Sequence, residues 1–308
     1  GASINVQIEQ LQQGFDIIVA TPGRLLDLIY NDHLSLAQFK TLVLDEADRM
    51  LDLGFKDEIN RILKFLPEQR QTLLFSATLS DDIYQMSQRF LHQPARVEVS
   101  PSNTAAETVE QIIYNVDPEQ KRGLCSYLIG SKNWQQVLIF TRTKKTADAL
   151  VQEMKKDGLS CVAIHGDKSQ GAREKALQQF KDNACRVLIA TDVAARGLDI
   201  KQLQYVINYE LPYNAEDYIH RIGRTGRAGD AGLAISLVSQ EELYLLKDIE
   251  ALLKTSLLQQ WFPGFEPDMD RVIGKKSHSQ GQDKRSARNK ALGIKAKNNK
   301  KHKSRPRR

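Results

Sequence analysis

Three carboxylates crowd the end of a short β-forming run early in the chain. Asp45, Glu46 and Asp48 follow the residues "TLVL" at 41–44. Like charges at this spacing repel one another, and loss of solvent raises that cost. Two interpretations account for the carboxylates. Acidic residues stabilise the N-terminus of a helix, and carboxylates at the end of a buried strand can hold a divalent cation.

A second group of charged residues is basic. The stretch "YIHRIGRTGRAG" at 218–229 places Arg221, Arg224 and Arg227 three residues apart, with glycines between them. A glycine inside a helix costs about 1 kcal/mol relative to alanine, so two of them indicate a backbone that must come close to another group. Arginine makes bidentate contacts with phosphate oxygens. The stretch therefore indicates phosphate binding, with a solvated basic surface as the alternative.

A third group of polar residues follows another apolar run. It lies in "IATDVAARGLDI" at 189–200 and comprises Thr191, Asp192, Arg196 and Asp199. In open parallel sheets, ligands bind beyond the carboxyl ends of the strands. In nucleotide hydrolases, a strand-terminal carboxylate holds Mg²⁺ below the phosphates and a neighbouring one orients the attacking water. The cation would then supply the positive charge that the acidic group lacks.

The acidic, basic and polar groups each lie in or beside a predicted element that would position them. Along the chain, strand-like segments alternate with helix-like segments. In the segment around 49–64, for example, Ile59, Ile62, Leu63 and Leu66 follow the spacing of one helical face. Such alternation predicts parallel βαβ units. Strands are predicted at 15–21, 41–47 and 71–78, and helices at 23–31, 49–64 and 80–91.

The pattern stops at "SPSNTAAET" (100–108) and then restarts. Strands are predicted at 135–141, 160–166, 186–192, 205–211 and 232–238, and helices at 144–157, 169–182, 214–222 and 240–253. We therefore predict an α/β protein with two open parallel-sheet domains, the first of them incomplete, and a basic tail. The predicted boundaries are 1–100 for the first domain, 101–108 for a linker, 109–255 for the second domain, 256–273 for a connector and 274–308 for the tail.

Positive charge is concentrated in the tail. The chain has 44 Lys/Arg and 38 Asp/Glu; residues 274–308 hold 14 of the former and one of the latter, which leaves 30 and 37 for residues 1–273. So few apolar residues cannot offset the entropy cost of ordering, which predicts disorder. A basic tail on an acidic body indicates a polyanionic partner, nucleic acid before a membrane surface, with a purely solubilising tail as the alternative.

Other features exclude several classes of protein. The three cysteines lack metal-ligand spacing and lie in or beside apolar runs, which predicts reduced core residues in a cytoplasmic protein. The six histidines are scattered, so a zinc site is not expected. No stretch approaches the roughly 18 apolar residues that a membrane span requires.

Taken in order, the motifs resemble those of the DEAD-box ATP-dependent RNA helicases, whose two domains are RecA-like. The matching stretches are "TPGRLLDL" (21–28), "DEAD" (45–48), "SAT" (76–78), "VLIFTRTK" (137–144), "HGDKSQGAREKALQQFK" (165–181), "ATDVAARGLDI" (190–200) and "HRIGRTGR" (220–227). "SKNWQQVLIFTRTK" and "FPGFEPD" resemble the bacterial RhlE type in particular. The resemblance covers about residues 1–265.

The resemblance implies RNA-stimulated ATP hydrolysis coupled to local unwinding of RNA duplexes, with ATP and Mg²⁺ as cofactors. Asp45 would hold Mg²⁺, Glu46 would activate the attacking water, and Arg224 and Arg227 would contact the γ-phosphate. Gly197 and Asp199 would contact the nucleotide, and coupling to RNA would involve Asp48, Ser76, Thr78 and His220. RNA would be bound through its backbone by Thr21, Gly23, Arg24, Thr141, Arg142, Gly166, Gln170, Arg173, Thr191 and Arg196. Because the carboxylates and the arginines lie on different domains, domain closure would couple ATP binding to RNA binding.

One expected motif is missing. A phosphate loop needs G-x-x-x-x-G-K-[ST], and the only Gly-Lys pair, Gly274-Lys275, is followed by Lys276. We therefore expect this chain to be an N-terminally truncated helicase that is inactive alone. The alternatives are a non-enzymatic RNA-binding module made of the second domain and the tail, and, more weakly, a DNA helicase of a related superfamily. Ribonucleoprotein or RNA-decay proteins are candidate partners of the tail.

Overall fold

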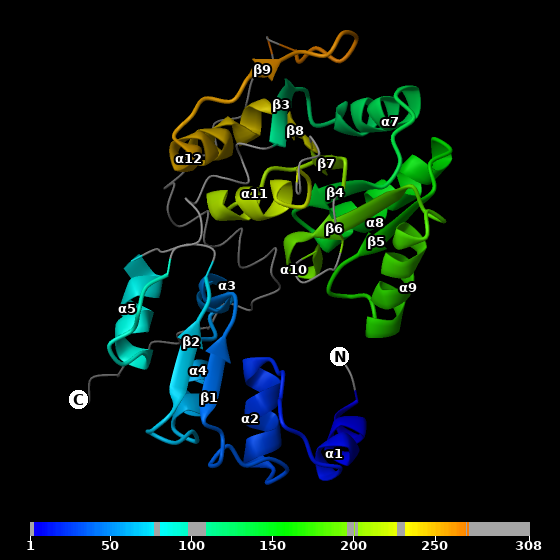
Figure 1. The fold of residues 1–308 in the computed structure, drawn as a ribbon. Coiled ribbons are helices and arrows are strands. Elements are labelled where there is room, and N and C mark those ends of the chain that lie inside the picture. The colour runs from blue at the N-terminus through cyan, green and yellow to red at the C-terminus, as the bar shows by residue number, and fades with distance from the viewer. Residues whose placement is uncertain are drawn as a thin grey trace, which may run out of the picture. The chain divides into compact units, whose positions relative to one another are not determined.

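The fold comes from a computed structural model, which describes residues 3–76, 81–97, 109–195, 200, 203–226, 232–268 and 270. The chain separates into two compact units, residues 1–102 and 103–308 (Figure 1). The predicted linker at 101–108 and the predicted tail at 274–308 lie outside the described residues.

Unit 1 is built around two parallel strands. Thr41 pairs with Gln71 and Leu44 with Leu74, which confirms two of the predicted strands. Its elements are α1 (Ile4–Gln12), α2 (Pro22–Tyr30), β1 (Thr41–Leu44), α3 (Ala47–Asp52), α4 (Lys56–Leu63), β2 (Gln71–Leu74) and α5 (Asp81–Phe90). Leu44, Ala47, Ile59, Ile83, Met86 and Phe90 form one core on the sheet. A second core, around Leu26, Ile29 and Ile62, joins α2 to α4.

Two predictions for unit 1 are wrong. Residues 15–21 form no strand, and the side chains of Ile17 and Val19 are 81% and 94% exposed. A parallel strand is stable only when hydrogen-bonded to a neighbour, and β1 pairs only with β2 among the described strands. The helix predicted at 49–64 is two helices, because Gly54 adopts a left-handed φ of 82° between α3 and α4.

Unit 2 contains a seven-stranded sheet with the order β5-β6-β4-β7-β8-β3-β9, and all of its pairs are parallel. The strands are β3 (Val109–Asn115), β4 (Val137–Thr141), β5 (Cys161–Ile164), β6 (Val187–Thr191), β7 (Tyr205–Asn208), β8 (Gly232–Val238) and β9 (Gln259–Gln260). The helices are α7 (Lys121–Ser131), α8 (Lys144–Lys156), α9 (Gln170–Lys181), α10 (Asp192–Ala195), α11 (Ala215–Ile222) and α12 (Leu243–Leu253), with a short 3₁₀ turn, η1 (Gln240–Glu242), before α12.

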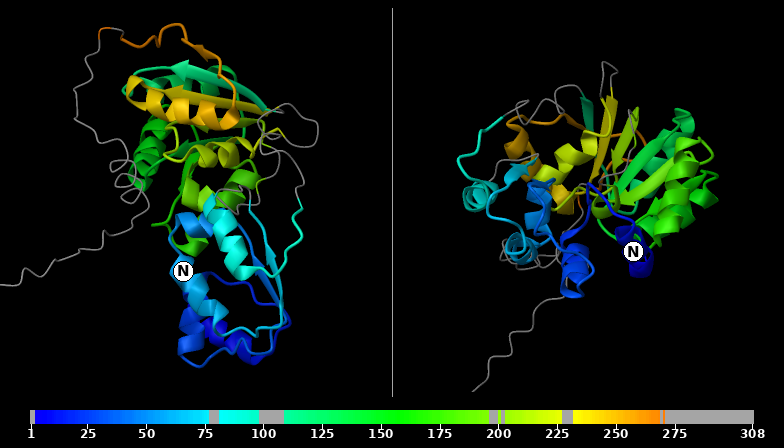
Figure 2. Two further views of the ribbon diagram at one scale, coloured as in Figure 1. Left: turned by 90° about the vertical axis from the view of Figure 1, so that its left-hand side faces the viewer. Right: turned by 60° about the horizontal axis from the view of Figure 1, so that its bottom comes forward.

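Helices cover both faces of this sheet (Figure 2). Side chains alternate between the faces of a strand. Val137 and Ile139 of β4 pack in the core formed with α7 and α8, whereas Leu138 and Phe140 pack in the core formed with α9 and α10. A third core lies on the faces of β3 and β8 that are opposite to α7 and α8. There the two strands pack against α11 and α12. Burial on both faces explains why these strands are nearly continuous apolar runs. The two-domain, parallel-sheet α/β prediction is confirmed.

The sequence analysis did not predict β3, β9 or α7. Strand β3 reads "VEQIIYN", with polar residues between the apolar ones, and β9 is two residues long. The connector after α12 is ordered against the sheet. Phe262 lies 5.4 Å from Tyr114 and 5.6 Å from Tyr127 between ring centroids, and β9 pairs with β3. The three cysteines are free and buried, as predicted. No helix in the described part of the chain has the length and apolar content needed to cross a lipid bilayer.

Candidate functional site

The acidic group lies at the carboxyl edge of the unit 1 sheet. Asp45 and Glu46 follow β1 and are exposed, whereas Asp48 is buried in the first turn of α3. Glu46 has a left-handed backbone, with φ 49° and ψ 51°. This conformation costs a non-glycine residue about 1–2 kcal/mol. Asp45 Oδ1 accepts a hydrogen bond from the Glu46 backbone N–H at 2.9 Å. A helix N-terminus thus accounts for Asp48, and the two exposed carboxylates precede that helix.

The end of β2 meets the same edge. The Ala47 backbone N–H donates to the Phe75 carbonyl at 3.0 Å, and the Phe75 N–H donates to the Leu44 carbonyl at 2.8 Å. Ser76, which follows, therefore lies beside the acidic group. The described residues contain no cluster of three or more potential metal-ligating side chains. Two exposed carboxylates suit Mg²⁺, which is commonly bound through one or two carboxylates while keeping several waters. Thr78 lies outside the described residues.

Thr21, Gly23 and Arg24 lie at the start of α2. Thr21 precedes the helix with an extended backbone, and Pro22 occupies the first helical position, where its missing N–H is tolerated. Arg24 Nη1 donates to Gln7 Oε1 of α1 at 2.7 Å. The first turn of α2 thus presents backbone N–H groups, which favour anions.

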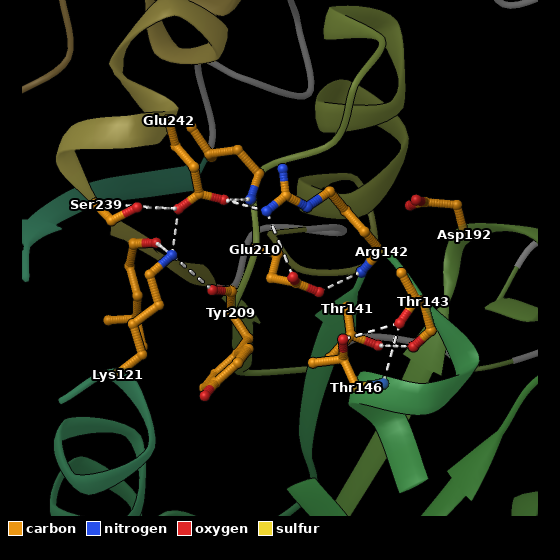
Figure 3. Close-up of polar contacts among 12 residues, drawn as sticks. Lys121, Thr141, Arg142, Thr143, Thr146, Asp192, Tyr209, Glu210, Ser239 and Glu242 are labelled. Carbon is orange, nitrogen blue, oxygen red and sulfur yellow. Dashed lines mark hydrogen bonds and ion pairs between the residues drawn. The ribbon is translucent and has the colours of Figure 1, made fainter. Parts of the chain in front are cut away.

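In unit 2, the strand ends carry a connected polar network (Figure 3). Arg142 directly follows β4. Its backbone N–H donates to Glu210 Oε2 at 2.8 Å, and its Nη2 lies 3.4 Å from Glu210 Oε1 and 3.1 Å from Glu242 Oε1. The guanidinium also lies 4.9 Å from the centroid of the Tyr213 ring. Arg142, predicted to contact RNA, is therefore engaged with two carboxylates of its own unit.

Lys121, a buried residue at the start of α7, also belongs to this network. The buried Lys121 Nζ donates to Glu242 Oε2, to the Leu237 carbonyl at 2.6 Å and to the Tyr209 carbonyl at 3.1 Å. Burial lowers the pKa of Lys121, and the Glu242 carboxylate opposes that shift. Burial alone would likewise lower the pKa of Arg142, but the carboxylates of Glu242 and Glu210 raise it. Two cations and two anions thus balance one another at a site with little solvent.

The next predicted RNA-contact residues begin α9. Ser169 caps this helix by accepting a hydrogen bond from the Ala172 N–H at 3.3 Å. Gln170 and Arg173 are joined, because Arg173 Nη2 donates to Gln170 Oε1 at 2.6 Å. Gly166 follows β5 on the same side of the sheet, since all strands are parallel.

The basic group begins on α11. His220 lies in the last turn of this helix and Arg224 just after it, and both are half-buried. The second glycine of this stretch has a structural explanation: Gly226 has φ 70°, and its backbone lies so close to Gly232 of β8 that a Cβ on Gly232 would overlap it and Thr225. The backbone thus approaches β8 of the same unit. Arg196, Gly197, Asp199 and Arg227 lie outside the described residues.

The first arginine of this group has a different environment from Arg224. Arg221 is 1% exposed and pairs with Asp192 at the end of β6, where Thr191 is also buried. Its Nη1 donates to the Glu210 carbonyl at 2.6 Å and to Asn208 Oδ1 at 3.2 Å. No role for Lys121, Glu210 or Glu242 is predicted from the sequence. One signal was available for Glu242, because Ser239–Glu242 has the spacing of a capping box, which the structure forms.

The comparisons with known proteins match both units. A family profile described as DEAD/DEAH box helicase matches residues 1–86, and one described as helicase conserved C-terminal domain matches residues 119–229. The ATP-dependent RNA helicase CshA of Listeria monocytogenes is 43% identical over 254 residues, which are 82% of this chain and 49% of that protein. This chain thus spans about half the length of that curated relative.

Two solved structures are also similar. Dbp5 of S. cerevisiae, solved bound to RNA and ADP BeF3, is 33% identical with a TM-score of 0.72, over 79% of this chain and 66% of that one. The E. coli DEAD-box protein SrmB, solved bound to regulator of ribonuclease activity A, is 31% identical with a TM-score of 0.50, over 54% of this chain and 98% of that one.

Proposed function

Because the chain belongs to the DEAD-box family of RNA helicases, we propose that it is part of an enzyme that couples ATP hydrolysis to local unwinding of RNA duplexes. The observation that carries this proposal is the edge of the unit 1 sheet, where Asp45 and Glu46 are exposed beside Ser76. Glu46 has a left-handed backbone there, and strained backbone residues of this kind cluster at active sites and ligand clamps.

In this proposal Asp45 would hold Mg²⁺, which would supply positive charge beside the phosphates of ATP. Glu46 accepts a hydrogen bond from the attacking water and orients it. Arg224 and Arg227 of unit 2 contact the γ-phosphate, and Gly197 and Asp199 contact the nucleotide. ATP hydrolysis is coupled to RNA unwinding by Asp48, Ser76, Thr78 and His220. The family match and the positions of the described residues among them support this assignment.

RNA is proposed to bind through its phosphates and sugars. In unit 1 the contacts come from the start of α2, at Thr21, Gly23 and Arg24. In unit 2 they come from residues at strand ends and at the start of α9: Thr141, Arg142, Gly166, Gln170, Arg173, Thr191 and Arg196. Support comes from the similarity to Dbp5, which was solved bound to RNA. Contacts with the backbone predict little preference for base sequence.

We further propose that these 308 residues do not hydrolyse ATP alone. They contain no phosphate loop. On one face of the unit 1 sheet, Val43 and Phe75 are 51% and 55% exposed in the described part of the chain. Parallel sheets are normally covered on both faces. The loop and the strands that pair with β1 would come from a segment outside this sequence.

A second candidate function is a non-enzymatic RNA-binding module made of unit 2 and residues 274–308. The seven-stranded sheet of unit 2 and the net charge of the tail, with 14 Lys/Arg and one acid, favour it. RhlE-type membership, a cytoplasmic location and tail contacts with ribonucleoprotein or RNA-decay proteins remain predictions.

The test is ATP hydrolysis by this chain with and without RNA, beside the Glu46→Gln variant. We expect no RNA-stimulated ATP hydrolysis by this chain. We expect hydrolysis once a segment carrying a phosphate loop is added to it. Turnover by the chain alone that Glu46→Gln abolishes would overturn the proposed inactivity. Failure of the lengthened protein to hydrolyse ATP, with RNA binding retained, would favour the module.

A further inference from the structure

The network around Arg142 points to a role for this residue that differs from that of its neighbours. The Glu210 carboxylate holds both parts of Arg142: Oε2 accepts from the backbone N–H at 2.8 Å, and Oε1 lies 3.4 Å from Nη2. Glu242 Oε1 lies 3.1 Å from the same Nη2. Two carboxylates thus lie against one nitrogen of this guanidinium and neutralise its charge, which weakens its attraction for an outside phosphate.

The contacts of Arg142 fix the turn that leads from β4 into α8. Thr141 Oγ1 donates to the Thr143 carbonyl at 3.3 Å, and Thr143 Oγ1 accepts from the Thr146 backbone N–H at 3.0 Å, which caps α8 (Figure 3). The clamped N–H of Arg142 lies between these two threonines. The turn therefore has its backbone and its hydroxyl groups held in one arrangement.

The far end of the network anchors it in the interior. Glu242 also binds the buried ammonium of Lys121, and it accepts from the Leu211 backbone N–H at 3.2 Å. The four charged residues come from the start of α7, from η1 and from the segments that follow β4 and β7. Because removal of one partner leaves an uncompensated charge, such an arrangement tolerates little displacement.

We propose that Arg142 is a positioning residue: Glu210 and Glu242 hold it, and through it the turn at 141–143, in the arrangement that binds RNA, and its guanidinium is not itself a phosphate ligand. The inference rests on the proposed binding of RNA by unit 2. It reassigns Arg142 from a phosphate ligand to a support, and it adds Glu210 and Glu242 as residues on which RNA affinity depends.

The two roles predict opposite effects of Glu210→Gln. If Arg142 were a phosphate ligand, neutralising Glu210 would free the guanidinium and remove a negative charge, so RNA would bind more tightly. If Arg142 is a support, the same change loosens the turn and RNA binds more weakly. Arg142→Gln weakens binding in either case, but loss of a phosphate ligand would also reduce the log–log salt slope by about 0.7.

The experiment measures the affinity of the full 308-residue chain for a labelled single-stranded oligouridylate over a series of salt concentrations. The variants are Arg142→Gln, Glu210→Gln, the double variant and Arg142→Lys. Arg122→Gln is the matched control, because Arg122 pairs with Asp157 at 2.6 Å on an exposed surface outside the network. Thermal unfolding of each variant shows that binding is measured on folded protein.

We expect Arg142→Gln and Glu210→Gln each to weaken binding about 3- to 10-fold with an unchanged salt slope, and the double variant to be no weaker than either. Arg142→Lys should recover part of the affinity, and Arg122→Gln should leave it unchanged. Tighter binding by Glu210→Gln, or a flatter slope for Arg142→Gln, would overturn the inference. So would lower unfolding temperatures with unchanged affinity, which would mean a purely structural role. If the unmodified chain fails to bind the oligouridylate, the proposed RNA binding by unit 2, on which the inference rests, is wrong for this chain.

Discussion

The guanidinium of Arg221 pairs with both carboxylate oxygens of Asp192, through Nε at 2.6 Å and Nη2 at 2.8 Å. The pair ties α11 to the end of β6, and the guanidinium lies 5.0 Å from the centroid of the Phe140 ring. Three residues further on, Arg224 has the proposed role of contacting phosphate. Of these two arginines, three residues apart in one motif, Arg221 is thus buried inside the fold, whereas Arg224 is proposed to belong to the site.

Replacement of Arg221 by leucine should destabilise unit 2 by about 3–5 kcal/mol, because Asp192 would lose its counter-charge. Both tryptophans, Trp134 and Trp261, lie in unit 2, so fluorescence during urea unfolding reports on this unit. The control is Arg122→Leu, which breaks an exposed pair and should cost less than about 1 kcal/mol. Equal losses in the two variants would contradict the assignment of Arg221 as a buried clamp.

Gly232 should not tolerate a side chain. A Cβ there would lie 2.8 Å from the Gly226 Cα and would overlap Thr225 Oγ1. Gly232→Ala should therefore destabilise unit 2 by about 1–3 kcal/mol, as overpacking of a core does. Gly130 of α7 has open space around its Cβ position, and Gly130→Ala should stabilise by up to about 1 kcal/mol. Thermal unfolding of the two variants should shift in opposite directions; a neutral Gly232→Ala would contradict the close approach of the two backbones.

The buried thiols should be unreactive in the folded protein. Burial, with a smaller contribution from Cys185, raises the pKa of Cys161 from 9.0 to about 11, and burial also raises the pKa of Cys125. Because the thiolate is the nucleophile, alkylation by iodoacetamide at mildly alkaline pH should be slow until guanidinium chloride unfolds the chain. Mass spectrometry would count the modified cysteines, and rapid native alkylation would contradict their burial.

The same shift predicts a loss of stability at high pH. The folded state binds the Cys161 proton more tightly than the unfolded state, so the contribution is fully present below pH 9.0 and is lost as the pH rises through about 11. In urea unfolding, the free energy of unfolding should fall over this pH window. The fall, measured for each protein relative to its own value at neutral pH, should be smaller in Cys161→Ala. An identical pH profile in the two proteins would remove Cys161 as a cause.

Deletion of residues 274–308 should reduce the salt dependence of RNA binding. Each phosphate neutralised on a single strand contributes about −0.7 to the log–log slope, and the tail holds 14 Lys/Arg. A variant that replaces these residues by serine and keeps the length separates charge from chain length. An unchanged slope in both variants would leave the tail with a solubilising role alone.

The sequence by itself determined the features that depend on neighbouring residues. Apolar runs predicted buried strands, and the segment predicted at 232–238 coincides with β8. The spacing of Asp45, Glu46 and Asp48 after such a run placed them at a sheet edge, because a strand and the residues that follow it are local in the chain. Local patterning also identified the helix at 23–31, which the structure has as α2 over Pro22–Tyr30.

Only the tertiary structure decided which segments and charges find partners. Residues 15–21 have the composition of a strand but form none, since pairing depends on a neighbour that their own sequence does not specify. Lys121 and Glu242 are 121 residues apart and bind one another inside unit 2, where burial makes an unpaired charge costly. The sequence predicts Arg142 and Arg221 to be phosphate ligands. In the structure, Arg142 lies against Glu210 and Glu242, and Arg221 pairs with Asp192. The sequence shows which charged residues a motif contains. Packing decides which of these residues are already paired with a residue of opposite charge within the fold.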